Sequence, residues 1–431
     1  MNAYSLFAED AIQRYRELPE EQNELYKRKY VSLDPAHLLE LFGKRSGVAA
    51  KEFDPDTVSK SLFEGSVVKF DAMISSGWHS VTGEGKRITV MDPSEMDMGS
   101  LERKLYRSSD DKLAALVHAF TEKIVMVDAA GRDKVRVNLL FLNSARPLAV
   151  QVMVNAWEGS SVDILEWYAS LPDGSSASCV MHEGTVGPYS SVSVDAVHNE
   201  GDSTVVVGLS KYRMGERADL RLNYFYNGGA SVRVKNEFEA AGAEGAVHAN
   251  ELVFGSGRQK FDISSRIVNG AKDSTAELHS RAVLRDESMC IMKGFAKIPF
   301  GSRGARSFVH ETGMLLDKRA YLESIPAMSI DENEVKATHS SATGPIDEEL
   351  IFYLMSKGLS EAKAKKLLVE GFFSGSIGRF RNANAKLAAA SLISEKTESG
   401  NFGGRLKISA ENIWVGRENE EDIFRGHYKY R

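Results

Sequence analysis

Hydrophobic and polar residues alternate along the middle of the chain, from about residue 126 to residue 345. This period of two residues is typical of β-strands. Turn signals such as Asn199-Glu200-Gly201-Asp202 and Asn227-Gly228-Gly229 separate the alternating segments. The clearest of these segments are 134–140, 149–154, 191–197, 204–209, 220–226, 231–234 and 276–284. We therefore predict a β region of about 200 residues without crossover helices.

Two architectures fit such a region: a large antiparallel sandwich or barrel, and a β-solenoid whose parallel strands are joined by turns. The pattern alone does not separate them. No strict repeat is visible in the sequence, which argues against a regular hexapeptide or nonapeptide β-helix.

Helical periodicity marks the N-terminal region, residues 1–125, which also contains strand-like stretches. Phe7, Ala11 and Tyr15 recur at helical spacing, and Asp34-Pro35 predicts the start of a second helix. Strands are expected within 66–92. A further helix is expected over 113–120, with Asp110 and Asp111 at its positive N-terminal end. This region is predicted to be mixed but mainly helical.

The C-terminal region, residues 346–394, is predicted to be helical, and residues 395–431 form a polar extension. Asp347 and Ser360 are placed to begin two helices, and Gly358 is placed to end the first in a tight turn. A third helix is expected over 379–394. The apolar faces of the first two helices are candidate partner-binding surfaces, and they contain Leu350, Ile351, Leu354, Leu367, Leu368 and Phe372.

Composition narrows the class of protein. The chain has 431 residues and a net charge of -6, which argues against a dedicated nucleic-acid binder. We find no apolar run long enough for a membrane helix and no signal peptide at the N-terminus. Only Cys179 and Cys290 are present, so a disulfide framework and a four-thiolate iron–sulfur site are excluded. We expect a cytoplasmic protein with both cysteines in buried, unreactive positions.

The search for catalytic motifs gives negative results. The segment 83–87 lacks the spacing of a phosphate-binding loop and is better explained as a hairpin turn. His310-Glu311 begins like a zinc-protease motif, but Met314 stands where the second histidine is required. We therefore predict that the chain is not an enzyme.

One long segment carries a family resemblance. Residues 326–373, PAMSIDENEVKATHSSATGPIDEELIFYLMSKGLSEAKAKKLLVEGFF, resemble the C-terminal signature of the SufB/SufD family of the SUF iron–sulfur cluster assembly system. The chain departs from that signature at Met328 and at Ser340-Ser341-Ala342, which follow His339. Weaker similarity extends over most of residues 1–394. The resemblance implies a right-handed parallel β-helix core at 126–345, flanked by the N-terminal and C-terminal helical regions.

The resemblance also indicates a branch of the family. SufB-type chains have a cysteine, the proposed acceptor of persulfide sulfur, at the position that Glu311 occupies here. A carboxylate can bind iron but cannot carry persulfide, so the chain resembles SufD more than SufB. His339 is then a candidate transient iron ligand at a partner interface. Glu311 is a weaker candidate and is expected to be a solvated or interface carboxylate.

These implications define an expected function: a SufD-like, non-catalytic subunit that acts with a SufB scaffold and the ABC-type ATPase SufC. The helices at 347–373 are the expected ATPase dock, and a transient iron–sulfur cluster at a subunit interface is the expected cargo. Two alternatives remain open. One is a SufB-like homodimeric scaffold that acts with SufC alone, and the other is a β-solenoid interaction protein without cluster chemistry. The sequence makes no prediction about flavin, sulfur donor or cluster type.

Overall fold

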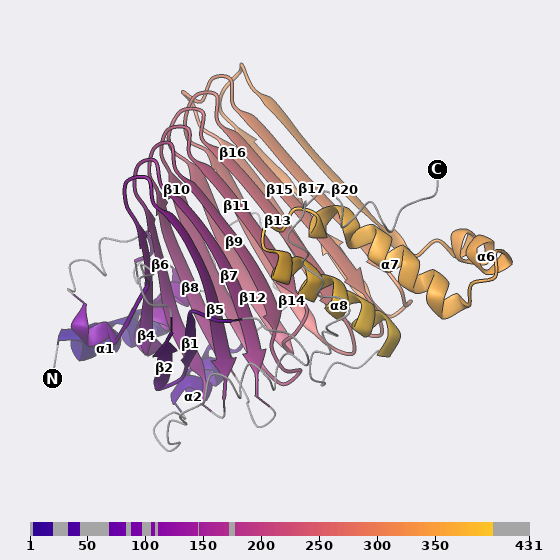
Figure 1. The fold of residues 1–431 in the computed structure, drawn as a ribbon, viewed down its shortest axis with the longest axis horizontal. Helices are drawn as coiled ribbons and strands as arrows, with labels where there is room; N and C mark the ends of the chain where they lie inside the picture. Colours follow the sequence, from indigo (N-terminus) through magenta and orange to yellow (C-terminus); the bar gives the residue numbers. More distant parts are fainter. Residues whose placement is uncertain are drawn as a thin grey trace.

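Two β-sheets that face each other form the body of the protein (Figure 1). The computed structural model describes residues 3–19, 33–43, 69–82, 88–96, 105–107, 111–144, 146–171 and 177–399. The strands described there are β1 (Ala72–Ser75), β2 (Trp78–Val81), β3 (Ile88–Met91), β4 (Lys123–Ala129), β5 (Lys134–Asn143), β6 (Leu148–Ala156), β7 (Ser161–Ser170), β8 (Ala177–Val186), β9 (Ser191–Asn199), β10 (Val205–Met214), β11 (Asp219–Tyr226), β12 (Ser231–Ala240), β13 (Ala246–Gly255), β14 (Lys260–Asn269), β15 (Thr275–Leu284), β16 (Met289–Ile298), β17 (Arg306–Leu315), β18 (Tyr321–Ser324), β19 (Ala327–Ile330) and β20 (Lys336–Pro345).

The strands of the core alternate between the two sheets as the chain proceeds. The first sheet, here called the β20 sheet, has the order β2-β1-β5-β7-β9-β11-β13-β15-β17-β20. The second, the β18 sheet, has the order β18-β16-β14-β12-β10-β8-β6-β4-β3, and β19 also pairs with β16. From β4 onward, neighbouring strands within each sheet pair in parallel. The chain is thus a β-solenoid of about seven turns, which decides between the two architectures left open by the sequence.

The coils of this solenoid are similar in length but not identical. Equivalent strands β7, β9, β11, β13, β15, β17 and β20 begin at residues 161, 191, 219, 246, 275, 306 and 336, so each coil adds between 27 and 31 residues. Each turn from the β18 sheet into strands β5 to β17 of the β20 sheet contains one residue with φ between 52° and 77°. These residues are Gly131, Gly159, Tyr189, Arg217, Glu244, Asp273 and Gly304.

Apolar side chains from both sheets fill the space between them, and almost all of these side chains are inaccessible to solvent. Aromatic rings stack from coil to coil within this core. Phe141, Tyr168, His198 and Tyr226 form such a ladder, with centroid separations of 4.7, 4.1 and 4.8 Å. Each stacked aromatic pair adds roughly 0.5–1.5 kcal/mol beyond its buried area. The ladder therefore stabilises the register between successive coils.

The N-terminal helices cover the outer face of the β18 sheet. They are α1 (Ala3–Glu17), α2 (Pro35–Gly43) and α5 (Lys112–Phe120), with a short 3-10 turn, η3 (Pro93–Glu95), nearby in the chain. Leu116 and Phe42 belong to a cluster that also contains Cys179 and Val207 of the sheet. Asp111 caps α5 by accepting hydrogen bonds from the amides of Leu113 and Ala114, as its position in the sequence predicts.

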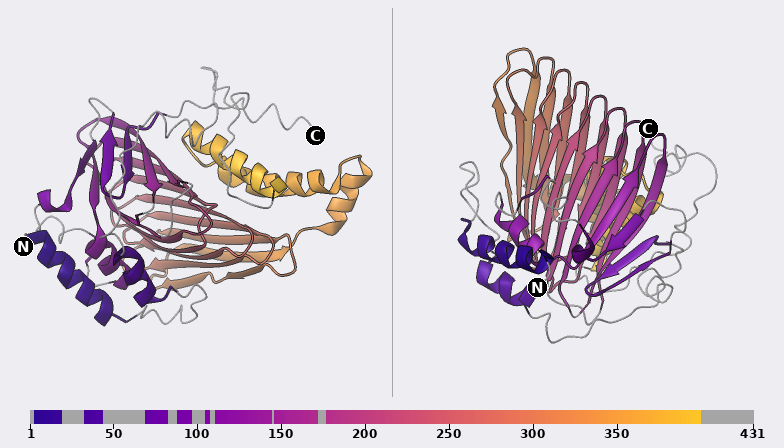
Figure 2. Two further views of the ribbon diagram at one scale, coloured as in Figure 1. Left: turned by 90° about the horizontal axis from the view of Figure 1, so that it is seen from below. Right: turned by 90° about the vertical axis from the view of Figure 1, so that its left-hand side faces the viewer.

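The C-terminal helices lie on the opposite side of the solenoid (Figure 2). They are α6 (Glu348–Ser356), α7 (Glu361–Ile377) and α8 (Ala383–Ser399). Phe373 of α7 and Leu392 of α8 are fully buried in a cluster with Phe225 and Phe254 of the β20 sheet. Lys396 of α8 is also fully buried, and its ammonium donates to the carbonyls of Asn227 and Phe254. In contrast, α6 projects beyond the end of the sheet (Figure 1).

The elements expected from the sequence are present, with shifts at their ends. The helical hairpin is α6 and α7, and Gly358 in its turn has φ +94°. The third predicted helix is α8, which begins at Ala383 and continues to Ser399. The hairpin turn predicted at 83–87 and most of the extension, residues 400–431, lie outside the described residues.

Candidate functional site

The last coil of the solenoid leaves one end of its interior open. Among the described strands, β20 pairs only with β17, and the short strands β18 and β19 are the last on the other side, where both pair with β16. Nine of the ten residues of β17 are buried or half-buried, whereas eight of the ten residues of β20 are exposed. The face and the edge of β20 are therefore accessible in this chain.

His339 lies at this open end. It is the register partner of Val309, which is itself paired with Leu278. Partners in adjacent strands point to the same side of a sheet, and both Val309 and Leu278 are fully buried between the sheets. The imidazole of His339 thus continues an interior row of the solenoid, but it is exposed because no further coil among the described residues covers it.

Glu311 lies one coil deeper and is completely buried. The Ser324 hydroxyl donates a hydrogen bond to its Oε2 atom. The carboxyl group fits only because residue 294 is a glycine, since a Cβ atom there would lie 2.6 Å from Oε1. Burial raises the pKa of Glu311 to about 7, and the hydrogen bond from Ser324 opposes this effect. The expectation of a solvated or interface carboxylate is therefore wrong for this chain.

Hydroxyl groups connect Glu311 to the open end. Ser341 of β20 is the register partner of Glu311, and its Oγ donates to Ser324 Oγ over 2.7 Å. Ser324 donates in turn to Glu311. A second buried carboxyl group, Glu251, lies two coils deeper in the same row and accepts from Ser280 over 2.8 Å. The interior thus holds a polar row that ends at the exposed residue Ser341, two residues from His339.

The helical hairpin places the predicted partner-binding residues in different environments. Ile351 is buried against Ala364 within the hairpin, and Leu354 and Leu368 pack on the same small cluster. Phe372 packs toward the solenoid, where Arg281 lies over its ring. The other two residues, Leu350 and Leu367, are exposed.

Sequence reasoning assigned Met355 to the apolar face of this helix, but it did not include two other exposed apolar side chains of α6, Phe352 and Tyr353. Phe352 is 74% exposed, more than any of the predicted residues. The sequence did contain an indication of them, because all six residues from Leu350 to Met355 are apolar. A short helix with one buried face cannot bury six consecutive apolar residues, so some of them must be exposed.

Both cysteines are buried, as expected, and neither forms a disulfide in the described part of the chain. Within the described ranges, no group of three or more histidine, cysteine or acidic side chains is arranged to hold a metal ion. The helices described here include none that is long and apolar enough to cross a membrane.

Comparison with known proteins agrees with this architecture. Residues 141–372, more than half of the chain, match the family described as the SUF system FeS cluster assembly, SufBD core domain. The chain belongs to the SufBD family. It is 25% identical over 251 residues to the iron-sulfur cluster assembly protein SufD of Bacillus subtilis, which covers 57% of each chain.

Two further SufBD relatives show the same level of similarity. The chain is 25% identical over 274 residues to an iron-sulfur cluster assembly SufBD family protein of Pyrococcus horikoshii, covering 62% of this chain and 61% of that protein. It is 28% identical over 186 residues to a SufBD family protein of Mycobacterium tuberculosis, covering 41% of this chain and 47% of that protein. The matches span about half to three fifths of the length of these relatives.

Proposed function

We propose that this SufBD-family protein is the SufD-like, non-catalytic subunit of an iron–sulfur cluster assembly complex. In this role it acts in the cytoplasm with a SufB-type scaffold and a SufC-type ABC ATPase. The observation that carries the proposal is the open end of the solenoid, where His339 extends an interior row into solvent. Support for the SufD-like branch comes from Glu311, which stands where SufB-type chains have their cysteine, and from the similarity to the Bacillus subtilis protein.

His339 supplies a suitable group for nascent cluster chemistry. Neutral imidazole binds iron, and histidine replaces thiolate on one iron of Rieske centres. An exposed imidazole can reach a cluster that assembles between two subunits. Glu311 is a weaker ligand candidate because its carboxyl group is buried and holds its proton up to about pH 7. The iron–sulfur cluster is cargo in this scheme, shared with the partner and then passed on.

The partners are assigned to two separate surfaces. The scaffold pairs with β20, because an uncovered strand edge offers backbone hydrogen bonds that a partner strand can complete. The ATPase docks on α6, where Leu350, Phe352, Tyr353 and Met355 are exposed side by side in the sequence. A second copy of this chain would also fit the β20 edge, and this is the homodimeric scaffold alternative. The composition of the purified complex distinguishes the two arrangements.

The decisive test is His339→Ala, with His37→Ala as a matched control. Both histidines are exposed, but His37 lies on α2, far along the chain from the open end. In cells, we expect His339→Ala to leave the complex assembled and to reduce the activity of iron–sulfur enzymes several-fold, whereas His37→Ala should have no effect. Full activity of His339→Ala, or loss of activity only because the partners no longer co-purify, would refute the role of His339 in cluster chemistry.

A further inference from the structure

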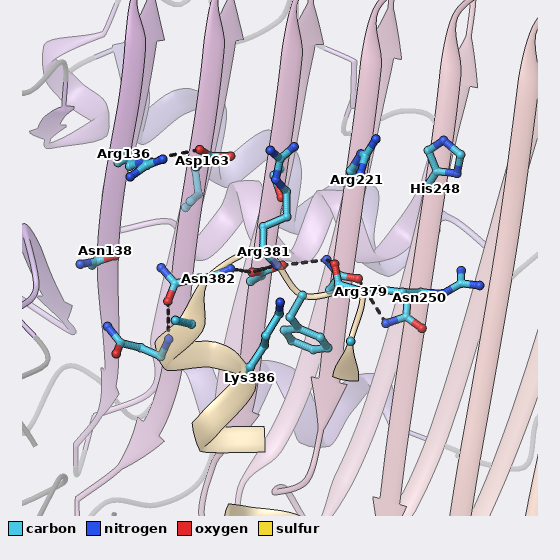
Figure 3. A pocket seen from close by; sticks show the side chains of 18 of the residues that line it. Arg136, Asn138, Asp163, Arg221, His248, Asn250, Arg379, Arg381, Asn382 and Lys386 are labelled. Carbon is cyan, nitrogen blue, oxygen red and sulfur yellow. Dashed lines mark hydrogen bonds and ion pairs between the residues drawn. The ribbon is translucent and has the colours of Figure 1, made fainter. Parts of the chain in front are cut away.

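A polar groove lies on the outer face of the β20 sheet, away from the open end and from α6. It has a volume of ≈ 830 Å³ and lies between the sheet and residues 378–386, which connect α7 to α8 and begin α8 (Figure 3). This volume falls in the range of roughly 300–1,000 Å³ that is usual for small-molecule sites. Nothing in the proposed assembly function uses this groove.

The floor of the groove is built from two rows of outward-facing side chains. Both rows are mainly polar, which is unusual beside a sheet face that is otherwise covered by apolar helix contacts. Register partners on successive strands form the first row, Arg136, Asp163, Ser193, Arg221, His248 and Glu277. The second row includes Asn138, Asp195, Asn223 and Asn250. The lining therefore favours a polar ligand over an apolar one.

Asp195 holds the rim of the groove in place. Its carboxylate accepts hydrogen bonds from the amides of Arg381 (2.7 Å) and Asn382 (2.5 Å) and from Asn223 Nδ2 (2.7 Å). Asn382 then caps α8 by accepting from the amides of Asn384 and Ala385. The positive N-terminal end of a 17-residue helix is thereby fixed at the groove.

One cation of the rim, Lys386, interacts electrostatically with an acid of the floor, because its charge opposes the rise in the pKa of Asp195 that burial causes. Within the described chain, the side chains of Arg379, Arg381 and Lys386 make no hydrogen bond or ion pair, and Figure 3 shows Lys386 pointing toward the floor. The acidic groups nearby already have partners. Asp163 pairs with Arg136 at 3.6 Å, and Glu277 pairs with His248 at 3.2 Å. The groove thus presents an excess of positive charge.

Two buried polar atoms in the floor lack a hydrogen-bond partner among the described residues. One is the Oγ atom of Ser193, which is 3% exposed, and the other is the Oδ1 atom of Asn250, which is 2% exposed. Both residues line the groove. An unpaired buried polar group destabilises the folded state, so a site that retains two of them is prepared for a polar ligand.

We propose that this groove binds a small molecule that carries phosphate groups and is about the size of a nucleotide. Arg379, Arg381 and Lys386 bind the phosphate oxygens together with the N-terminal end of α8. The hydroxyl of Ser193 donates to the ligand, and Asn250 Oδ1 accepts from it. The polar and charged side chains of the lining favour a free phosphate compound over the tail of a lipid.

The test measures binding of inorganic phosphate, pyrophosphate and ADP to the full chain by titration calorimetry in chloride buffer near physiological salt. We expect saturable one-to-one binding of pyrophosphate or ADP. The double variant Arg379→Gln/Arg381→Gln should bind at least tenfold more weakly. Tighter binding of ADP than of pyrophosphate would support a nucleotide, and equal binding would support recognition of the phosphates alone.

Two further variants separate a built site from general charge effects. Arg213→Gln/Arg258→Gln removes two exposed charges elsewhere on the solenoid and should leave binding unchanged. Ser193→Ala should weaken binding severalfold without lowering the melting temperature, because it removes an unpaired hydroxyl. The proposal is overturned if none of the three probes binds saturably at several millimolar, or if both double variants weaken binding equally.

Discussion

Glu311→Gln tests whether the carboxyl group inside the solenoid is protonated at neutral pH. Burial raises the pKa of Glu311 from 4.5 in the unfolded chain to about 7 in the folded protein. Between these values the folded state holds a proton that the unfolded state has released. The free energy of unfolding must therefore fall as pH rises, by about 1.4 kcal/mol per pH unit. Over the whole interval this loss is about 3 kcal/mol, and it is complete above the folded pKa.

Glutamine keeps the shape of a protonated glutamate but does not ionise, so the variant should lack this loss. We expect urea unfolding between pH 4.5 and pH 8 to show wild type losing about 3 kcal/mol relative to Glu311→Gln, with the change spread over pH 4.5 to 7. Glu244→Gln is the control, because Glu244 is exposed and Arg217 lowers its pKa. Parallel stability curves for wild type and Glu311→Gln would show that Glu311 is already ionised inside the solenoid, and the argument from burial would fail.

Two other substitutions test the core and the docking surface. Lys293 and Asp262 form an ion pair of 2.8 Å with both side chains almost fully buried, so Lys293→Met should cost about 3–5 kcal/mol in urea unfolding. Arg217→Gln, which breaks an exposed ion pair with Glu244, should lower stability far less than Lys293→Met, and equal losses would contradict the assigned burial. Phe352→Ser with Tyr353→Ser should abolish co-purification of the ATPase while leaving thermal unfolding unchanged. Phe300→Ser, which alters an 86% exposed side chain in a turn, should not affect co-purification, and retained binding in the α6 variant would refute that dock.

The β character of the core was predictable because alternation survives in strands such as β5 and β12. The coil repeat was not predictable from turn residues. Four of its seven left-handed positions, Tyr189, Arg217, Glu244 and Asp273, are not glycine, so the expected turn signal is missing there. Variable coil length shifts the remaining signals out of phase. The family resemblance, and not periodicity, separated the solenoid from a sandwich.

The candidate site was predictable only in part. The signature around His339 placed that residue at the end of the β region, and the structure places it at the open end of the solenoid. The burial of Glu311 could not be predicted from the sequence, because Glu311 is charged and its neighbours on the same side of β17 include the small residues Ser307 and Gly313. The groove could not be predicted from the sequence either, since Asp195 and Arg381 are 186 residues apart and meet only after the later coils have stacked and the C-terminal helices have folded back onto the sheet.

The two ends of the coil stack are finished differently. At the first end, the antiparallel strands β2 and β3 close the two sheets, whereas β20 has no strand beyond it in the described chain. In a linear array each unit is held only by its nearest neighbours, so a unit with one neighbour opens most often. Amide hydrogens of β20 should then exchange faster than those of β17, and those of β17 faster than those of β15. This gradient makes the last coil a reporter of partner binding, since a bound scaffold would slow exchange there first.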